Sequence, residues 1–198
     1  MRLCLKLKAN INELDHEGQT PLQVALRGLL SASKHSMGWV GQRRQGWFDM
    51  IDLLLAQGAN VDGPPDKCNG YTALQYAVEC LEFPLVARLI DLGADLNTPR
   101  NYRCGGFRGK TAIILAVESG SLEILHLLIK KGADVNTAGC RYPYGDGTAL
   151  DTAARHGYLD MVQFLINRGQ TRIFQGARGT EARKRKRGSG VIRLLLGC

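Results

Sequence analysis

The amino-acid sequence predicts an all-α protein built from repeated helix–turn–helix units that are joined by hairpin-like loops. Three phrases recur in a fixed order along the 198 residues, and such internal repeats indicate a repeat architecture. A glycine–alanine–Asx phrase occurs at residues 58–62, 93–97 and 132–136, with a weaker echo at residues 9–12. A threonine-containing phrase occurs at 18–25, 70–77, 109–116 and 147–153, and an apolar run at 50–55, 86–90, 124–129 and 161–166.

The threonine of each second phrase is placed to begin a helix. A threonine hydroxyl just before a helix accepts a hydrogen bond from a backbone N–H group that the helix leaves unpaired. Pro21 follows the first of these threonines, at a helical position where a missing N–H group costs nothing. The four predicted caps are Thr20, Thr72, Thr111 and Thr148.

Glycines mark the predicted ends of the helices. Gly120 and Gly157 fit a tight turn between the first and the second helix of a unit. The second helix is expected to end at a residue with a left-handed backbone conformation, which favours glycine. The glycines predicted at that position are Gly58, Gly93, Gly132 and Gly169.

The stretch from Asp15 to Leu22 is similar to the opening phrase of the ankyrin repeat family, and the three phrases follow in that family's order over residues 9–169. The resemblance implies an all-α solenoid that binds another protein as a scaffold or adaptor and performs no catalysis. One departure concerns the histidine that the family usually carries after its Thr-Pro-Leu motif, so the hydrogen bond between repeats is expected to be lost or replaced. The residues at that position here are Gln23, Gln75, Ile114 and Asp151.

The phrases divide the chain into repeats. We expect a partial preceding repeat at 1–12, an ankyrin repeat at 13–62 with an insertion at 31–46, further repeats at 63–97, 98–136 and 137–169, and a basic, degenerate terminal repeat at 170–198. Residues 3–12 and 191–196 resemble incomplete second helices, so we expect the stack to continue beyond both ends.

The insertion at 31–46 is predicted to form a loop, because glycine, serine and basic residues are frequent in it. Insertions into repeats fall on loops and sometimes carry binding. Trp39 is the candidate partner-binding residue here, since tryptophan is a common interface anchor. The alternative is that Trp39 folds back over the edge of the neighbouring helices.

Two long loops before the third and fourth repeats interleave aromatic residues with arginine, which supply contact area and forked hydrogen bonds. In the ankyrin family, hairpin tips and the adjoining face of the first helices form the concave binding surface. The alternative is that the tyrosines pack one hairpin on the next. The predicted partner-binding residues are Tyr102, Arg103, Phe107, Arg108, Arg141, Tyr142 and Tyr144.

The residues after the helix alanines are expected to be exposed along that surface and to change from acidic to basic. They are the pairs Glu79 and Cys80, Glu118 and Ser119, and Arg155 and His156.

The net charge of +8 is concentrated in the tail, because residues 171–198 carry eight basic side chains and one acidic one. The run Arg183, Lys184, Arg185, Lys186 and Arg187 has three interpretations: a nuclear import signal, incidental solvated charge, or a contact to nucleic acid or an acidic partner. A nuclear or nucleic-acid-associated regulator that uses this run is therefore the alternative function.

Other function classes find no support in the sequence. There is no phosphate-binding glycine loop, nucleophile elbow or zinc-binding histidine pair, so we expect no enzyme activity, no cofactor and no metal. No apolar stretch is long enough for a membrane span, and the first residues do not form a secretory signal. The expected setting is intracellular, either cytoplasmic or nuclear, with another protein as partner.

Overall fold

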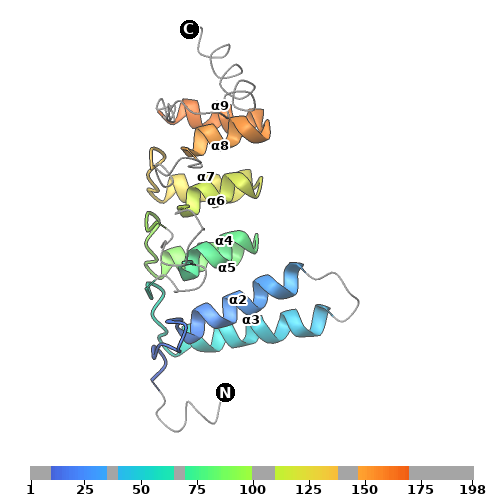
Figure 1. Ribbon diagram of the computed structural model, residues 1–198, viewed down its shortest axis with the longest axis vertical. Coiled ribbons are helices and arrows are strands. Elements are labelled where there is room, and N and C mark those ends of the chain that lie inside the picture. The colour runs from blue at the N-terminus through green and yellow to red at the C-terminus, as the bar shows by residue number, and fades with distance from the viewer. Residues whose placement is uncertain (1–9, 35–39, 65–69, 100–109, 138–146, 170–198) are drawn as a thin grey trace. The chain divides into compact units, whose positions relative to one another are not determined.

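The computed structural model describes residues 10–34, 40–64, 70–99, 110–137 and 147–169 (Figure 1). These residues form consecutive helix pairs, which confirms the predicted all-α repeat fold. The helices are α2 (Pro21–Lys34), α3 (Val40–Ala56), α4 (Ala73–Glu79), α5 (Phe83–Asp91), α6 (Ala112–Glu118), α7 (Leu122–Lys130), α8 (Ala149–His156) and α9 (Leu159–Asn167).

The helices fall into two compact units, the first with α2 to α5 and the second with α6 to α9. In the first unit α2 packs against α3 and α4, and α4 packs against α5. In the second unit α6 packs against α7 and α8, and α8 packs against α9. Within each unit, therefore, the first helix of one repeat lies against the first helix of the next.

First and second helices bury different shares of their surface. Residues 73–78 of α4 and 112–117 of α6 are all buried, as expected for helices with a neighbour on several sides. The second helix α9 buries only Met161, Val162 and Leu165, which lie on one face at helical spacing. The fully buried alanines Ala77 and Ala153 leave room for close helix approach.

The prediction that residues 31–46 form a loop is wrong for most of that segment. Residues 31–34 continue α2 and residues 40–46 begin α3. These helices have 14 and 17 residues, whereas the other first and second helices have 7 to 9. The insertion therefore lengthens both helices of the first repeat, and only residues 35–39 lie outside the described residues.

Tertiary contacts explain why serine and glycine did not end these helices. Arg44 forms an ion pair with Glu82 at the turn between α4 and α5, which links the added part of α3 to the next repeat. Gln45 donates a hydrogen bond to Asp49 one turn later, at 2.9 Å. The ring of Trp47 lies directly against Gly28 of α2, where the absence of a side chain leaves room for it. Such contacts outweigh the weak helix propensity of glycine.

The predicted glycine positions are confirmed. Gly58, Gly93, Gly132 and Gly169 end their second helices with φ angles of 81°, 95°, 98° and 83°. Gly120 and Gly157 form the turns between helices with φ angles of 70° and 76°. The second repeat differs, because Leu81 occupies this turn position with a φ of 60° and a half-exposed side chain. Pro84 lies in the first turn of α5, as predicted.

Candidate binding surfaces

The first helices begin with capping boxes in three of the four repeats. The Thr72 hydroxyl accepts from the backbone N–H of Gln75, while Gln75 Oε1 accepts from the N–H of Thr72. Thr148 and Asp151 form the same pair in the fourth repeat. Such a reciprocal arrangement satisfies two backbone donors and fixes where the helix begins.

Gln23 adds a bond between repeats to this cap. Its Oε1 atom accepts from the N–H of Thr20 at 2.7 Å, and its Nε2 atom donates to the carbonyl oxygens of Pro64 and Tyr71 at 2.6 and 3.2 Å. The bond expected from the missing family histidine is therefore replaced in the first repeat. Gln23 is fully buried, so these partners are needed to offset the loss of hydration.

The third repeat lacks this cap. Thr111 stands at the same position, but its hydroxyl makes no capping bond and is buried without a partner among the described residues. The residue three positions later is Ile114, which has no polar atom in its side chain. The prediction that Thr111 caps its helix is therefore wrong, whereas those for Thr20, Thr72 and Thr148 are confirmed.

Loops of successive repeats are joined by a repeated side-chain bond. Asn12 Oδ1 accepts from the backbone N–H of Asn60 at 2.8 Å, and Asp62 Oδ1 accepts from Asp95 at 2.7 Å. In the second unit, the Asn97 and Asp134 pair makes the equivalent bond at 2.9 Å. The Asx residues of the recurring phrase thus set the spacing of neighbouring loops. One of them, Asn97, lies shortly before the predicted binding loop that begins at Pro99.

The C-terminal ends of α4 and α6 each carry a glutamate that is bound to the residue two positions before the start of the same helix. The Tyr71 hydroxyl donates to Glu79 at 2.5 Å, and Lys110 Nζ lies 2.6 Å from Glu118 Oε2. Both side chains of the second pair are only 22% exposed. The charge that Glu118 would offer to a partner is therefore largely neutralised by Lys110.

The end of α8 is basic and exposed. Arg155 and His156 are exposed, as predicted, and the His156 ring stacks on Tyr158 with the ring centres 5.5 Å apart. The prediction that Cys80 is exposed is wrong, because its side chain is 6% exposed. A thiol is weakly polar and packs like a small apolar group, which explains the burial of Cys80.

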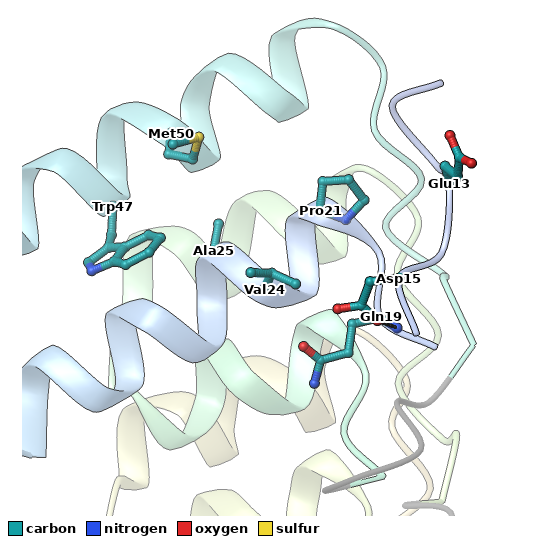
Figure 2. A pocket seen from close by; sticks show the side chains of 8 residues that line it. All are labelled: Glu13, Asp15, Gln19, Pro21, Val24, Ala25, Trp47 and Met50. Carbon is teal, nitrogen blue, oxygen red and sulfur yellow. Dashed lines mark hydrogen bonds between the residues drawn. The ribbon is translucent and has the colours of Figure 1, made fainter. Parts of the chain in front are cut away.

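A further hollow lies between α2 and α3, on the side of α2 that carries Pro21, Val24 and Ala25 (Figure 2). Trp47 and Met50 project from α3 toward these residues. The hollow has a volume of about 190 Å³ and is mostly apolar, with acidic residues at one end. Its lining residues are Glu13, Asp15, Gln19, Pro21, Val24, Ala25, Trp47 and Met50.

Comparison with known proteins agrees with this geometry. A family model described as ankyrin repeats, in three copies, matches residues 85–173. Residues 85–173 are therefore ankyrin repeats. A search among curated proteins found no match to the chain. Ankyrin repeats are in general protein–protein interaction modules, and the ankyrin fold explains the shared order of helix, turn and helix in the described repeats.

All of the partner-binding residues predicted from the sequence lie outside the described residues. The same is true of the basic run at 183–187. The partner-binding residues concerned are Trp39, Tyr102, Arg103, Phe107, Arg108, Arg141, Tyr142 and Tyr144.

The hollow on the first repeat was not predicted from the sequence. A signal for it exists in the spacing of Pro21, Val24 and Gly28, which share one face of α2 at helical intervals. Trp47 and Met50 are likewise three residues apart on α3. Apolar residues on such a face are normally read as buried core, so the spacing alone did not indicate that this surface is open.

Proposed function

We propose that this ankyrin protein is a non-catalytic scaffold or adaptor that binds another protein through the ends of its first helices and the two loops beside them. The observation that carries the proposal is the exposed basic end of α8, formed by Arg155 and His156. This helix begins at the fourth-repeat cap, which follows the predicted loop of aromatic and arginine residues at 140–146.

The bases of both loops are held in place, which favours binding because less conformational entropy is lost. The predicted loop at 99–108 follows Asn97, whose side chain is bound to Asp134, and precedes Lys110, which is paired with Glu118. The predicted loop at 140–146 is followed by the capping pair of Thr148 and Asp151. Tyrosine and arginine side chains supply contact area and planar hydrogen-bond donors in binding surfaces.

Non-catalytic action is supported by the contacts of two histidines among the described residues. His126 packs on Phe164 at 5.5 Å, and His156 stacks on Tyr158. The Nδ1 atom of His156 lies 2.9 Å from the backbone oxygen of Thr152, so this ring atom is engaged in the helix. These are packing and surface roles. Within the described residues, no helix is long and apolar enough to cross a membrane.

The test compares proteins captured from the native cell by the full chain and by two variants. In the loop variant Tyr102, Arg103, Phe107 and Arg108 are replaced by alanine. In the matched control the exposed Lys130 and Lys131 at the end of α7 are replaced by alanine. We expect a partner that the loop variant loses and the control retains, and direct titration with that purified partner should give the same order. If every captured protein binds the loop variant as well as the wild type, the loops are not the site.

A second candidate function rests on the basic run from Arg183 to Arg187. Five consecutive cations are typical of nuclear import signals and of contacts to phosphate groups. We propose that, if this run is an import signal, replacing it with alanine shifts a fluorescent fusion from the nucleus to the cytoplasm, and an unchanged distribution would exclude import. Binding to random-sequence DNA that falls steeply with salt would instead indicate phosphate contacts.

A further inference from the structure

The side chain of Gln19 is fully buried and lines the hollow between α2 and α3. Neither the Nε2 nor the Oε1 atom of its amide has a hydrogen-bond partner in the part of the chain that the structure describes. Buried polar atoms are nearly always paired in folded proteins, because burial removes their hydration. The amide therefore points to a group that enters the hollow and pairs with it.

A comparison of the repeats explains why this amide is left without a partner. Gln19 lies two positions before the start of α2, and the residues at this position in the next two repeats are Tyr71 and Lys110. Each of those two is bonded to the glutamate at the end of its own helix. In α2 the position of that glutamate holds Arg27, whose guanidinium lies 2.5 Å from Glu17. The first repeat therefore lacks the carboxylate to which this position binds elsewhere.

The apolar walls of the hollow are accessible to another molecule. Pro21, Val24, Trp47 and Met50 are each half-buried. In the second repeat, where α2 packs against α4, the residues equivalent to Pro21, Val24 and Met50 are at most 6% exposed. Those equivalent residues are Ala73, Tyr76 and Leu85. The first repeat thus leaves uncovered an apolar face that is covered in the second.

The hollow has different chemistry at its two ends. Figure 2 shows Asp15 and Gln19 at one end and Trp47 at the other, with Val24 between them. Asp15 Oδ1 accepts a hydrogen bond from the backbone N–H of Gln19 at 2.8 Å, so the carboxylate is held beside the buried amide. Glu13 adds a second carboxylate to the lining, and neither acid is paired with a cation among the described residues. An occupant that matches both ends has an apolar stem and a cationic head.

An arginine side chain meets these requirements. Its methylene groups pack on apolar surface while its guanidinium offers five N–H donors, which can reach a carboxylate and an amide oxygen together. A cavity of about 150 Å³ accommodates a molecule of the size of benzene, so a hollow of about 190 Å³ has room for this side chain. The guanidinium accepts no hydrogen bond, and the Gln19 Nε2 group still needs an acceptor. A backbone carbonyl beside the arginine supplies one, which favours an arginine within a polypeptide.

We propose that the hollow binds an arginine side chain of another protein, with the methylene groups on Val24 and Trp47 and the guanidinium bonded to Asp15 and to Gln19 Oε1. No hydrogen bond of the Gln19 amide has to break when it turns toward the arginine. This site is separate from the loops proposed above to bind a partner. Loss of binding at one of the two sites therefore leaves the other proposal untouched.

The experiment titrates the full chain carrying Trp39→Phe, so that the remaining indole N–H signal in a proton–nitrogen correlation spectrum belongs to Trp47. The probes are N-acetyl-arginine methylamide, the same compound with citrulline, which has a similar shape without the charge, and the same compound with norleucine. Sodium chloride keeps the ionic strength equal. A second signal, the side-chain amide of Gln19, is assigned by its absence from Gln19→Leu.

Three variants locate the binding site. Asp15→Asn removes the charge and keeps an oxygen that can accept from the N–H of Gln19, and Gln19→Leu removes the amide. Asp49→Asn is the matched control, because Asp49 is an exposed acid of α3 that does not line the hollow. Far-UV circular dichroism establishes that each variant is folded.

We expect the arginine probe to shift both signals to saturation, and citrulline to bind about tenfold more weakly, because a hydrogen bond to a charged group is lost. Asp15→Asn and Gln19→Leu should each weaken arginine binding by a similar factor, while Asp49→Asn leaves it unchanged. The proposal is wrong if neither signal shifts or if Asp15→Asn binds as the parent does. Equal binding of norleucine would assign the hollow to an apolar side chain, and tighter binding of free arginine would assign it to the amino acid. Signals that move on dilution without probe, together with dimers in analytical ultracentrifugation, would assign it to a second copy of the chain.

Discussion

The contact between Gly28 of α2 and Trp47 of α3 allows one prediction to be worked out in detail. An alanine methyl group at residue 28 would lie 2.5 Å from Cζ2 of Trp47 and 2.6 Å from Cε2. Real side chains do not approach so closely, so the indole or the helix must move. The same substitution at Gly46, which is also inside a helix, meets no atom within 4 Å.

Two opposing effects determine how much Gly28→Ala changes the free energy of unfolding. Alanine is favoured over glycine in a helix interior by about 1 kcal/mol. Forcing an extra methyl group into a packed site costs about 1–3 kcal/mol. Gly46→Ala should therefore raise the free energy of unfolding by about 1 kcal/mol. Gly28→Ala should leave it unchanged or lower it by up to about 2 kcal/mol, because the packing cost is added there.

Urea unfolding followed by circular dichroism measures both variants against the wild type. Thermal unfolding gives a second readout, at about 2–4 °C for each kcal/mol in a chain of this size. Gly28→Ala is also measured in a protein that already carries Trp47→Leu. In that background it should change the free energy of unfolding by nearly as much as Gly46→Ala does in the wild type. If Gly28→Ala stabilises the protein as much as Gly46→Ala, then Trp47 does not press on α2 and the explanation of the lengthened first repeat fails.

Four further substitutions test local features of the repeats by the same unfolding measurement. Leu81→Gly should raise the free energy of unfolding by about 0.5–1 kcal/mol, because it relieves a left-handed conformation that is unfavourable for leucine; a lower midpoint would contradict this. Thr72→Val should lower it by about 1 kcal/mol through loss of the cap, whereas Thr111→Val, which removes an unpaired hydroxyl, should cost less than about 0.5 kcal/mol. Equal losses at these two sites would show that the caps do not differ. Gln23→Met should lower it by about 2–4 kcal/mol, because it leaves buried backbone groups of two repeats unpaired, and a loss below that of Thr72→Val would count against the bridging role.

The sequence by itself determined where the repeats lie along the chain. The caps at Thr72 and Thr148 and the left-handed glycines at Gly93 and Gly157 are confirmed, because each depends on backbone groups within a few residues along the chain. Thr111 is the exception, and its failure could also have been read from the sequence. Gln75 and Asp151 accept a hydrogen bond from the threonine N–H in their own repeats, whereas Ile114 has no side-chain acceptor.

Only the tertiary structure decided the features that depend on distant contacts. Serine and glycine in residues 31–46 indicated a loop, but Arg44 reaches Glu82 and Trp47 reaches Gly28, so the helices continue. The hollow between α2 and α3 was not predicted from the sequence either, since Pro21, Val24 and Met50 have the apolar spacing of core residues. Whether such a face is core or binding surface depends on which helix lies against it. That is set by the stacking of repeats, which the local pattern of residues does not contain.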